Sequence, residues 1–416
     1  MLTLTRNDRP NYELFTVAIN AITENMGIPI DMVRLKGYYD FYTEKLSDIR
    51  EKINKHAQTK GVAWINPNSW QQLQDFLINK EYIPRDLLKK GNTNKLTTGS
   101  DQLRKVYEKI KTPFIPLIIE YKEINEVVKS LAEIYKYVRM PIEPMENDDG
   151  HELGLVFPTF ERRATSRFYS ATPNIQGLHS EVKGIISALK GYTLVSCDFK
   201  QQELIISLST ICRTPKLMKY LSSEKDKYTG FIKYLSDLDT IDEELRDKYK
   251  VGILASSYGS GLNTIRDSTQ SWEIARQIYN FYQNNETLKN YKKGVYERMR
   301  KGDDTILSFF GTPRKLDRSV RSDILDREII NTPIQTTGAD LSVFSLTAIV
   351  EESSSKNYSY AEDYWMVLPR HDEIVFMVKD EHLDVLSPLI HQNFHIQVED
   401  WTPILSSKFE GKYYNA

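Results

Sequence analysis

The segment WMVLPRHDEIVFMV, residues 365–378, constrains the fold more than any other stretch of the chain. Two apolar runs, rich in β-branched and aromatic residues, flank a short polar Pro-Arg-His-Asp sequence, and this pattern is typical of a β-hairpin. The apolar flanks predict that the hairpin is buried. Two adjacent carboxylates, Asp372 and Glu373, therefore lie at or beside the turn of an element that is otherwise apolar.

A second candidate strand, YTLVSCDF at residues 192–199, also ends in an acid, Asp198, and a helical pattern follows it. If this strand pairs with the hairpin, Asp198 and Asp372 meet at one edge of the sheet. Two carboxylates a few ångströms apart raise each other's pKa unless a cation lies between them. Hard oxygen ligands favour Mg²⁺ or Mn²⁺. The alternative is an ordinary turn acid and an unrelated acid at a strand end.

Helical patterns fill most of the remaining chain, and Ser69 is a plausible N-cap for one of them. The expected helical stretches are residues 12–56, 69–80, 113–138, 216–306, 326–351 and a probable helix that carries His391 and His395. Residues 141–152, PIEPMENDDGHE, have the composition of a linker. Few strands, far apart in the sequence and separated by helices, predict an α+β fold with a small antiparallel sheet between two helical units.

Composition excludes several classes of protein. The 416-residue chain has a net charge of −2, no apolar run long enough to span a bilayer and only two cysteines, so we expect a cytoplasmic protein without disulfides. Two segments are nevertheless basic: residues 80–111 hold nine Lys or Arg against four acids, and residues 289–301 hold six against one. These segments are either solvated faces or surfaces for a polyanion.

The sequence RDKYKVGILASSYG, residues 246–259, places Arg246, Lys250, Leu254 and Tyr258 four residues apart on one side of a predicted helix. The two cations suit a triphosphate, and the flat groups further along suit a base or a sugar. The alternative is that Arg246 and Lys250 are simply exposed to solvent and that the apolar positions after them belong to the hydrophobic core.

Taken together, these segments resemble the polymerase core of the family A DNA polymerases, the bacterial DNA polymerase I type. SCDFKQQEL, RDKYKVGILASSYG and RHDEIVF are similar to the three catalytic motifs of that family, and they occur in the same order. TSRFYSATPNIQGL (165–178) resembles its primer–template segment, DREIINTPIQTTGAD (326–340) its minor-groove helix and INPNSWQQLQDFL the start of its thumb. The resemblance covers nearly the whole chain.

The resemblance implies a two-metal site and a nucleotide site. Asp198 and Asp372 would hold two Mg²⁺ ions, which Mn²⁺ can replace, with the Phe199 carbonyl as a further ligand and Glu373 as a secondary acid. Lys250 is also implied as a proton donor to pyrophosphate, and Glu203, packed against Tyr258, would exclude a ribose 2′-OH. The implied nucleotide-binding residues are Gln202, Glu203, Arg246, Lys250, Leu254 and Tyr258.

The resemblance also implies a set of DNA-binding residues. Arg167 and Gln335 would contact minor-groove acceptors, which are nearly independent of sequence and therefore report base-pair geometry. Arg327 and Asn331 would support the template strand, and His371 would touch the primer end. The complete implied set is Arg167, Asn174, Gln176, Arg327, Asn331, Gln335 and His371.

Two departures from the family pattern concern the nucleotide pocket. Leu254 stands where the family usually carries Phe or Tyr, and Tyr228 stands where a His is common. We expect a DNA-templated DNA polymerase that uses dNTPs. A single-subunit RNA polymerase or reverse transcriptase of related fold is one alternative, although Glu203 argues against the use of ribonucleotides. An inactive or specialised nucleic-acid-binding relative is the other.

The implied architecture is the right-hand polymerase fold. Residues 1–30 would form an initial helix beside the palm, 31–130 the thumb, 131–215 a linker and the first part of the palm, 216–324 the fingers and 325–416 the second part of the palm. We expect neither a proofreading exonuclease nor a 5′ nuclease domain, and a monomer. The small size suits a phage or another mobile element, and no helicase, primase or separate exonuclease partner can be named.

The basic segment at residues 80–111 generates a prediction for DNA binding. If it grips duplex phosphates, the affinity for a primer–template should fall steeply between low and moderate salt, because each neutralised phosphate releases a counterion. Fluorescence anisotropy of a labelled duplex, titrated at several salt concentrations, measures this slope. A flat response would contradict the assignment.

Overall fold

The computed structural model describes residues 1–89, 95–257 and 259–414. The chain divides into two compact units. The first consists of Met1–Ile28, Phe157–Ala171 and Gly191–Lys412, and the second of Pro29–Val156, Thr172–Lys190 and Tyr413–Ala416. Within the described residues, no helix is both long and apolar enough to cross a membrane.

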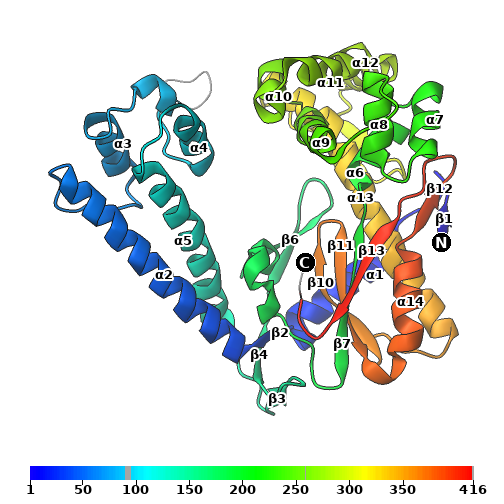
Figure 1. The fold of residues 1–416 in the computed structure, drawn as a ribbon. Helices are drawn as coiled ribbons and strands as arrows, with labels where there is room; N and C mark the ends of the chain where they lie inside the picture. Colours follow the sequence, from blue (N-terminus) through cyan, green and yellow to red (C-terminus); the bar gives the residue numbers. More distant parts are fainter. Residues whose placement is uncertain (90–94, 258, 415–416) are drawn as a thin grey trace. The chain divides into compact units, whose positions relative to one another are not determined.

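A four-stranded antiparallel sheet, in the order β10-β11-β7-β13, lies at the centre of the first unit (Figure 1). It confirms the predicted hairpin, β10 (Tyr364–Arg370) and β11 (Glu373–Lys379), and the predicted strand β7 (Tyr192–Phe199). Successive residues of β10 and β11 are buried, as expected when both faces of a sheet are covered. The edge strand β13 (Ser406–Gly411) is polar and largely exposed, which disfavours its pairing with a strand of another molecule.

Helices pack around this sheet. The helix α14 (Leu383–Asn393) contacts β7, β11 and β13, while α1 (Tyr12–Ala21) contacts β10 and the long helix α13 (Ser322–Ser355). The helix α13 contains the predicted stretch 326–351 and also packs on α6 (Gln202–Ser209). A short parallel pair, β1 (Leu2–Leu4) with β12 (Ile396–Val398), ties the N-terminal segment to the region after α14.

The helical part of the first unit follows β7 in the sequence. Its helices are α7 (Pro215–Ser223), α8 (Lys227–Ser236), α9 (Glu243–Ser257), α10 (Leu262–Thr269), α11 (Trp272–Asn284) and α12 (Glu286–Arg300). Polar side chains cap several N-termini, Thr214, Asp226, Ser271 and Asn285 among them. These caps set the helix starts without long connecting loops.

The predicted helical stretch 216–306 is wrong at its end. The helix α12 stops at Arg300, and a two-stranded hairpin follows, β8 (Thr305–Leu307) with β9 (Pro313–Lys315). Ile306 of this hairpin packs in one apolar cluster with residues of α12 and α13. Each strand has three residues, too few to show the alternation by which a strand is recognised.

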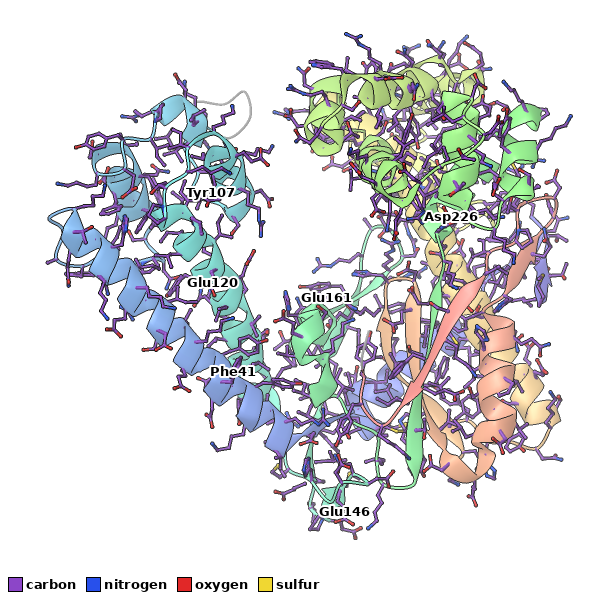
Figure 2. The ribbon with its side chains drawn as sticks, viewed as in Figure 1. Phe41, Tyr107, Glu120, Glu146, Glu161 and Asp226 are labelled. Atoms are coloured by element: carbon purple, nitrogen blue, oxygen red, sulfur yellow. The ribbon has the colours of Figure 1, made fainter. Side chains whose placement is uncertain are left out.

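Two long helices form the second unit, α2 (Met32–Thr59) and α5 (Phe114–Tyr137), which pack along each other with their side chains drawn in Figure 2. The shorter helices α3 (Trp70–Asn79) and α4 (Ser100–Lys109) follow α2 in the chain. The predicted cap is confirmed, because Ser69 Oγ accepts a hydrogen bond from the backbone N–H of Gln72.

The expected linker at 141–152 is instead part of a three-stranded sheet, in the order β2-β4-β3. Its strands are β2 (Ile28–Asp31), β4 (Glu152–Val156) and β3 (Met145–Glu146). The turn between β3 and β4 is held by Asn147, whose side-chain oxygen accepts from the N–H groups of Asp149 (3.1 Å) and His151 (2.9 Å). Its amide donates to the buried Asp31 at 3.0 Å. Polar composition here reflects a turn and not a free linker.

The histidine pair near the C-terminus also differs from expectation. His391 is on α14, but this helix ends at Asn393 and His395 lies beyond it. The Nδ1 of His395 donates to the carbonyl of His391 at 2.9 Å, and the two rings meet edge to face. The side chain of His395 therefore pairs with a backbone carbonyl of the last turn of α14.

The buried face of α2 generates a stability prediction. Leu35 of α2 is fully buried, whereas Val33, two residues earlier, is 53% exposed. Leu35→Ala should lower the free energy of unfolding by about 2–5 kcal/mol, through lost apolar burial and the cavity left behind. Val33→Ala should change it by less than about 0.5 kcal/mol. Urea denaturation followed by circular dichroism measures both, and equal effects would contradict the packing described.

Candidate active site

The two predicted acid-bearing strands pair directly. In the register of β11 with β7, Glu373 lies opposite Asp198, and on the other side of β7 Asp198 lies opposite Ser407. The N–H of Phe199 donates to the carbonyl of Asp372 at 3.1 Å. The pairing that brings Asp198 and Asp372 to one edge of the sheet is thus confirmed by the structure.

The electrostatics of this edge favour a cation. Burial raises the pKa of Asp372, and the carboxylate of Glu203 raises it further, while Arg167 and His371 oppose the shift. Glu373 is buried as well, with Arg370 3.9 Å from its Oε2. In the part of the chain that the structure describes, no three His, Cys, Asp or Glu side chains form a metal-binding group. Two carboxylates completed by carbonyl and substrate oxygens are, however, a common Mg²⁺ arrangement.

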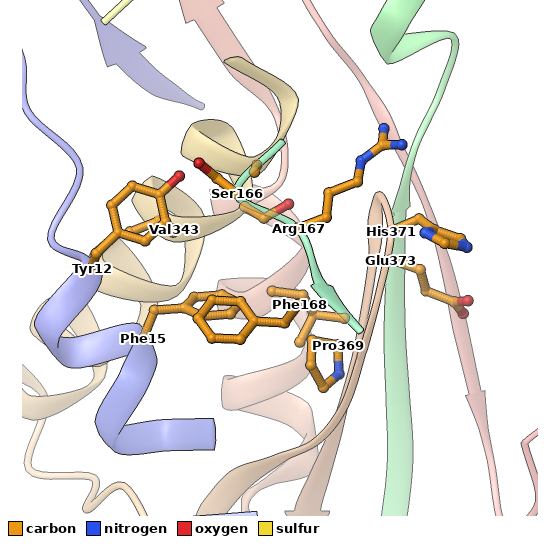
Figure 3. Close-up of a pocket in the computed structure, with 12 residues that line it drawn as sticks. Tyr12, Phe15, Ser166, Arg167, Phe168, Val343, Pro369, His371 and Glu373 are labelled. Carbon is orange, nitrogen blue, oxygen red and sulfur yellow. The ribbon is translucent and has the colours of Figure 1, made fainter. Parts of the chain in front are cut away.

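Arg167 and His371 lie beside these acids. Arg167, just before β6 (Phe168–Thr172), forms an ion pair with Glu203 on α6. His371 is at the hairpin turn with a φ of 55°, and burial together with the Arg167 cation lowers its pKa. Figure 3 shows Arg167, His371 and Glu373 on one side of a pocket whose wall includes the stacked rings of Phe15 and Phe168.

The predicted phosphate-binding cations share one surface of α9. The guanidinium of Arg246 lies 5.6 Å from the centre of the Tyr228 ring, and the Nζ of Lys250 lies 6.0 Å from it. Arg246 also forms two hydrogen bonds with Asp226, at 2.8 and 2.9 Å. Leu254 is half-buried one turn further along. Tyr258, which belongs to the same predicted set, lies outside the described residues.

Three predicted DNA-binding residues lie one turn apart on α13: Arg327, Asn331 and Gln335. Arg327 donates to the backbone carbonyl and the carboxylate of Asp323, at 3.0 and 2.7 Å. Its stem lies against Gly259, where φ is +76° and a Cβ would meet the Arg327 Cγ at 2.3 Å. The other two are half-buried.

The remaining predicted residues have structural contacts of their own. Gln202 is 2% exposed and donates to the carbonyl of Gly338 at 3.2 Å, so its side chain packs against α13. Asn174 and Gln176 belong to the second unit, where the Asn174 side chain accepts from the N–H of Gly177 at 3.0 Å and Gln176 is buried.

Sequence reasoning missed two groups at this site. Asp226 binds the Arg246 guanidinium, and its only sign in the sequence is its suitability as a helix cap. Tyr12 and Thr312 both donate to the Oδ1 of buried Asp340, at 2.6 and 2.8 Å, and burial raises the pKa of that acid. These contacts join positions 20 to 328 residues apart, which no local pattern reveals.

The arrangement of the sheet, its acids and the flanking helices defines a nucleic-acid polymerase fold of the right-hand type. The chain is similar in structure to the POL domain of Pol1 from M. smegmatis, solved in complex with a DNA primer-template and a dNTP. The TM-score is 0.79, with 21% identity over 96% of this chain and 70% of that one.

The family model for DNA polymerase family A matches residues 33–406, so the chain belongs to this family. It is 23% identical to DNA polymerase I of Aquifex aeolicus over 88% of this chain and 60% of that protein. It is 24% identical to DNA polymerase I of Bacillus subtilis over 88% of this chain, and 22% identical to the DNA polymerase of Escherichia phage T5 over 89%. The chain spans 41% and 47% of the length of these two relatives.

The raised pKa of Asp372 generates a prediction that needs no catalysis. Because the folded state disfavours the charged form, ionisation of Asp372 costs stability as the pH rises above the usual carboxyl range. Asp372→Asn should therefore raise the Tm of the metal-free protein at neutral pH by about 1–3 °C. The gain should vanish at low pH, where the wild-type carboxyl is protonated.

Differential scanning fluorimetry checks this, with Asp384→Asn, an exposed acid on α14, as the matched control. Mg²⁺ should raise the Tm of the wild type and of the control variant but not that of Asp372→Asn. A Tm that falls in metal-free Asp372→Asn would show that this carboxylate stabilises the fold.

Proposed function

We propose that this chain catalyses the DNA-templated addition of deoxynucleotides to the 3′ end of a primer. The observation that carries the proposal is the pairing of β11 with β7, which brings two acid-bearing strand ends together in the unit that also contains the α9 cations. Membership of DNA polymerase family A supports the same reaction. The fold and the family support a DNA polymerase domain, and primer extension with deoxynucleotides is the reaction proposed for it.

Asp198 and Asp372 would hold two Mg²⁺ ions, with the Phe199 carbonyl as a further ligand and Glu373 as a secondary acid. The fit is chemical: the Asp372 carboxylate is desolvated near the negative charge of Glu203, and a divalent cation would offset both effects. When bound, the ions supply a lowered pKa at the primer 3′-OH and neutralise the charge of the triphosphate. In the sheet Glu373 lies opposite Asp198, and Asp372 immediately precedes Glu373 at the hairpin turn.

Arg246 and Lys250 would bind the phosphates of the incoming nucleotide. Both are on α9, one turn apart, and both approach the ring of Tyr228. Lys250 is exposed, so its ammonium is accessible as a donor to the leaving pyrophosphate. Leu254, one turn further along α9, would belong to the same nucleotide-binding set, as would Tyr258, which lies outside the described residues.

Glu203 would exclude ribonucleotides by occupying the space that a 2′-OH requires. Its ion pair with Arg167 supports this assignment, since the pair fixes a carboxylate close to the acids of the sheet. Arg167 and Gln335 would contact minor-groove acceptors, and His371 would touch the primer end. Arg327 and Asn331 would support the template strand. Residues 31–130, in the second unit, would act as the thumb on the duplex and 216–324 as the fingers.

A primer-extension assay tests the proposal. With a DNA primer–template and Mg²⁺, the wild type should extend with dNTPs and at least about a hundredfold less with rNTPs, since Glu203 blocks the 2′-OH. Asp372→Ala should lower the extension rate by at least about a thousandfold, through loss of a metal ligand.

Glu381→Ala is the matched control, because Glu381 is an exposed acid that follows the same hairpin. Its rate should equal that of the wild type. Equal use of dNTPs and rNTPs would favour an RNA polymerase. Binding of the template without any extension would favour an inactive relative.

A further inference from the structure

Asp226 joins three parts of the first unit through one carboxylate. It lies at the N-terminus of α8, where its Oδ2 accepts hydrogen bonds from the N–H and the hydroxyl of Thr229, at 2.9 and 2.7 Å (Figure 2). The same carboxylate accepts from Arg246 on α9 and from the side-chain amide of Gln201. A helix cap alone needs only the first of these contacts.

The contact with Arg246 is side-on. Nε donates to Oδ2 at 2.8 Å and Nη2 donates to Oδ1 at 2.9 Å, with both side chains between one quarter and one third exposed. A guanidinium has five N–H groups in a rigid plane, so this pair uses one edge and leaves the other edge available. Among the described residues, the Nη1 on that other edge has one hydrogen-bond contact, a long one of 3.4 Å with Asp247.

Gln201 connects this pair to the strand that bears the first acid. It is two residues beyond the end of β7, in the left-handed region with a φ of 58°. Its side-chain NH2 group donates to Asp226, and its side-chain oxygen, Oε1, accepts from the backbone N–H of Lys227 at 2.8 Å. The position of Arg246 is thereby tied to the strand end that carries Asp198.

We propose that Asp226 is a positioning residue that orients Arg246 so that its free edge meets the phosphates of the incoming nucleotide. This inference rests on the proposed function, because it presumes that Arg246 binds those phosphates. Hydrogen bonds from Arg246, Thr229 and Gln201 outweigh the effect of burial and lower the pKa of Asp226, so the carboxylate is ionised at neutral pH. A fixed guanidinium loses less side-chain entropy on binding than a free one.

The opposite role makes an opposite prediction. If Asp226 were a latch that keeps Arg246 away from the nucleotide, the phosphates would have to displace the carboxylate, and removing its charge would tighten binding. The side-on geometry favours positioning, because the guanidinium edge that faces Asp226 is not the edge a second anion needs.

Asp226→Asn is the discriminating variant. Asn retains the size and the capping oxygen, so α8 should still form, but it loses the charge and one acceptor for Arg246. We expect the KM for dNTPs to rise about tenfold, with a smaller change in kcat, since hydrogen bonds to charged groups contribute more than neutral ones. In the absence of DNA, calorimetry should show a similar weakening for dATP and for inorganic tripolyphosphate.

Asp400→Asn is the matched control, since Asp400 forms another two-bond contact with an arginine, Arg213, outside the site. It should leave KM and tripolyphosphate affinity unchanged. The decisive test repeats Asp226→Asn in an Arg246→Ala background. A positioning role predicts that the effect of Asp226→Asn disappears there.

A lower KM in Asp226→Asn, an unchanged KM, or an equal effect in both backgrounds would each overturn the proposal. Wild-type extension with dNTPs tests the proposed function separately. If the wild type extends but the Asp226 variant behaves like it, only the positioning role is wrong. If the wild type does not extend, tripolyphosphate affinity in the four proteins of the cycle still decides between the two roles.

Discussion

The antiparallel pairing of β11 with β7 is the contact on which the rest of the molecule depends. Asp198 and Glu373 lie directly opposite each other, and a strand has a side-chain period of two, so a slip of one residue in this pairing would turn these two side chains to opposite faces. The apolar side chains of both strands oppose such a slip, because it would also move their buried residues. The core and the geometry of the candidate active site are therefore fixed by one set of contacts.

Local pattern was enough to predict the elements that carry the proposed chemistry. The hairpin, β7, α5 and the Ser69 cap were all visible because their periodicity or capping residues are contained in a few neighbouring positions. Resemblance to a family then supplied roles for the acids and for the α9 cations. Those roles, unlike the elements, remain proposals.

Elements without a local pattern were missed. The strands β3, β8 and β9 have two or three residues each, and their pairing is stabilised by packing against distant segments. The contacts of Asp226 and Asp340 were invisible for the same reason, since a polar pair across 20 or more residues leaves no periodic trace. Sequence reasoning thus succeeded for contacts between residues close in the sequence. It failed for contacts between residues that only the tertiary structure brings together.

The order of strands in the central sheet has a consequence for how the chain folds. Asp198 and Asp372 are brought together although 174 positions separate them, and β13 comes later still. During synthesis β7 therefore has neither of its sheet neighbours until the long helical segment between the two acids has been made. Closing such a long loop is slow and exposes an apolar strand meanwhile. The helices encoded between the two acids can form locally, so they can be folded before the two acid-bearing strands meet.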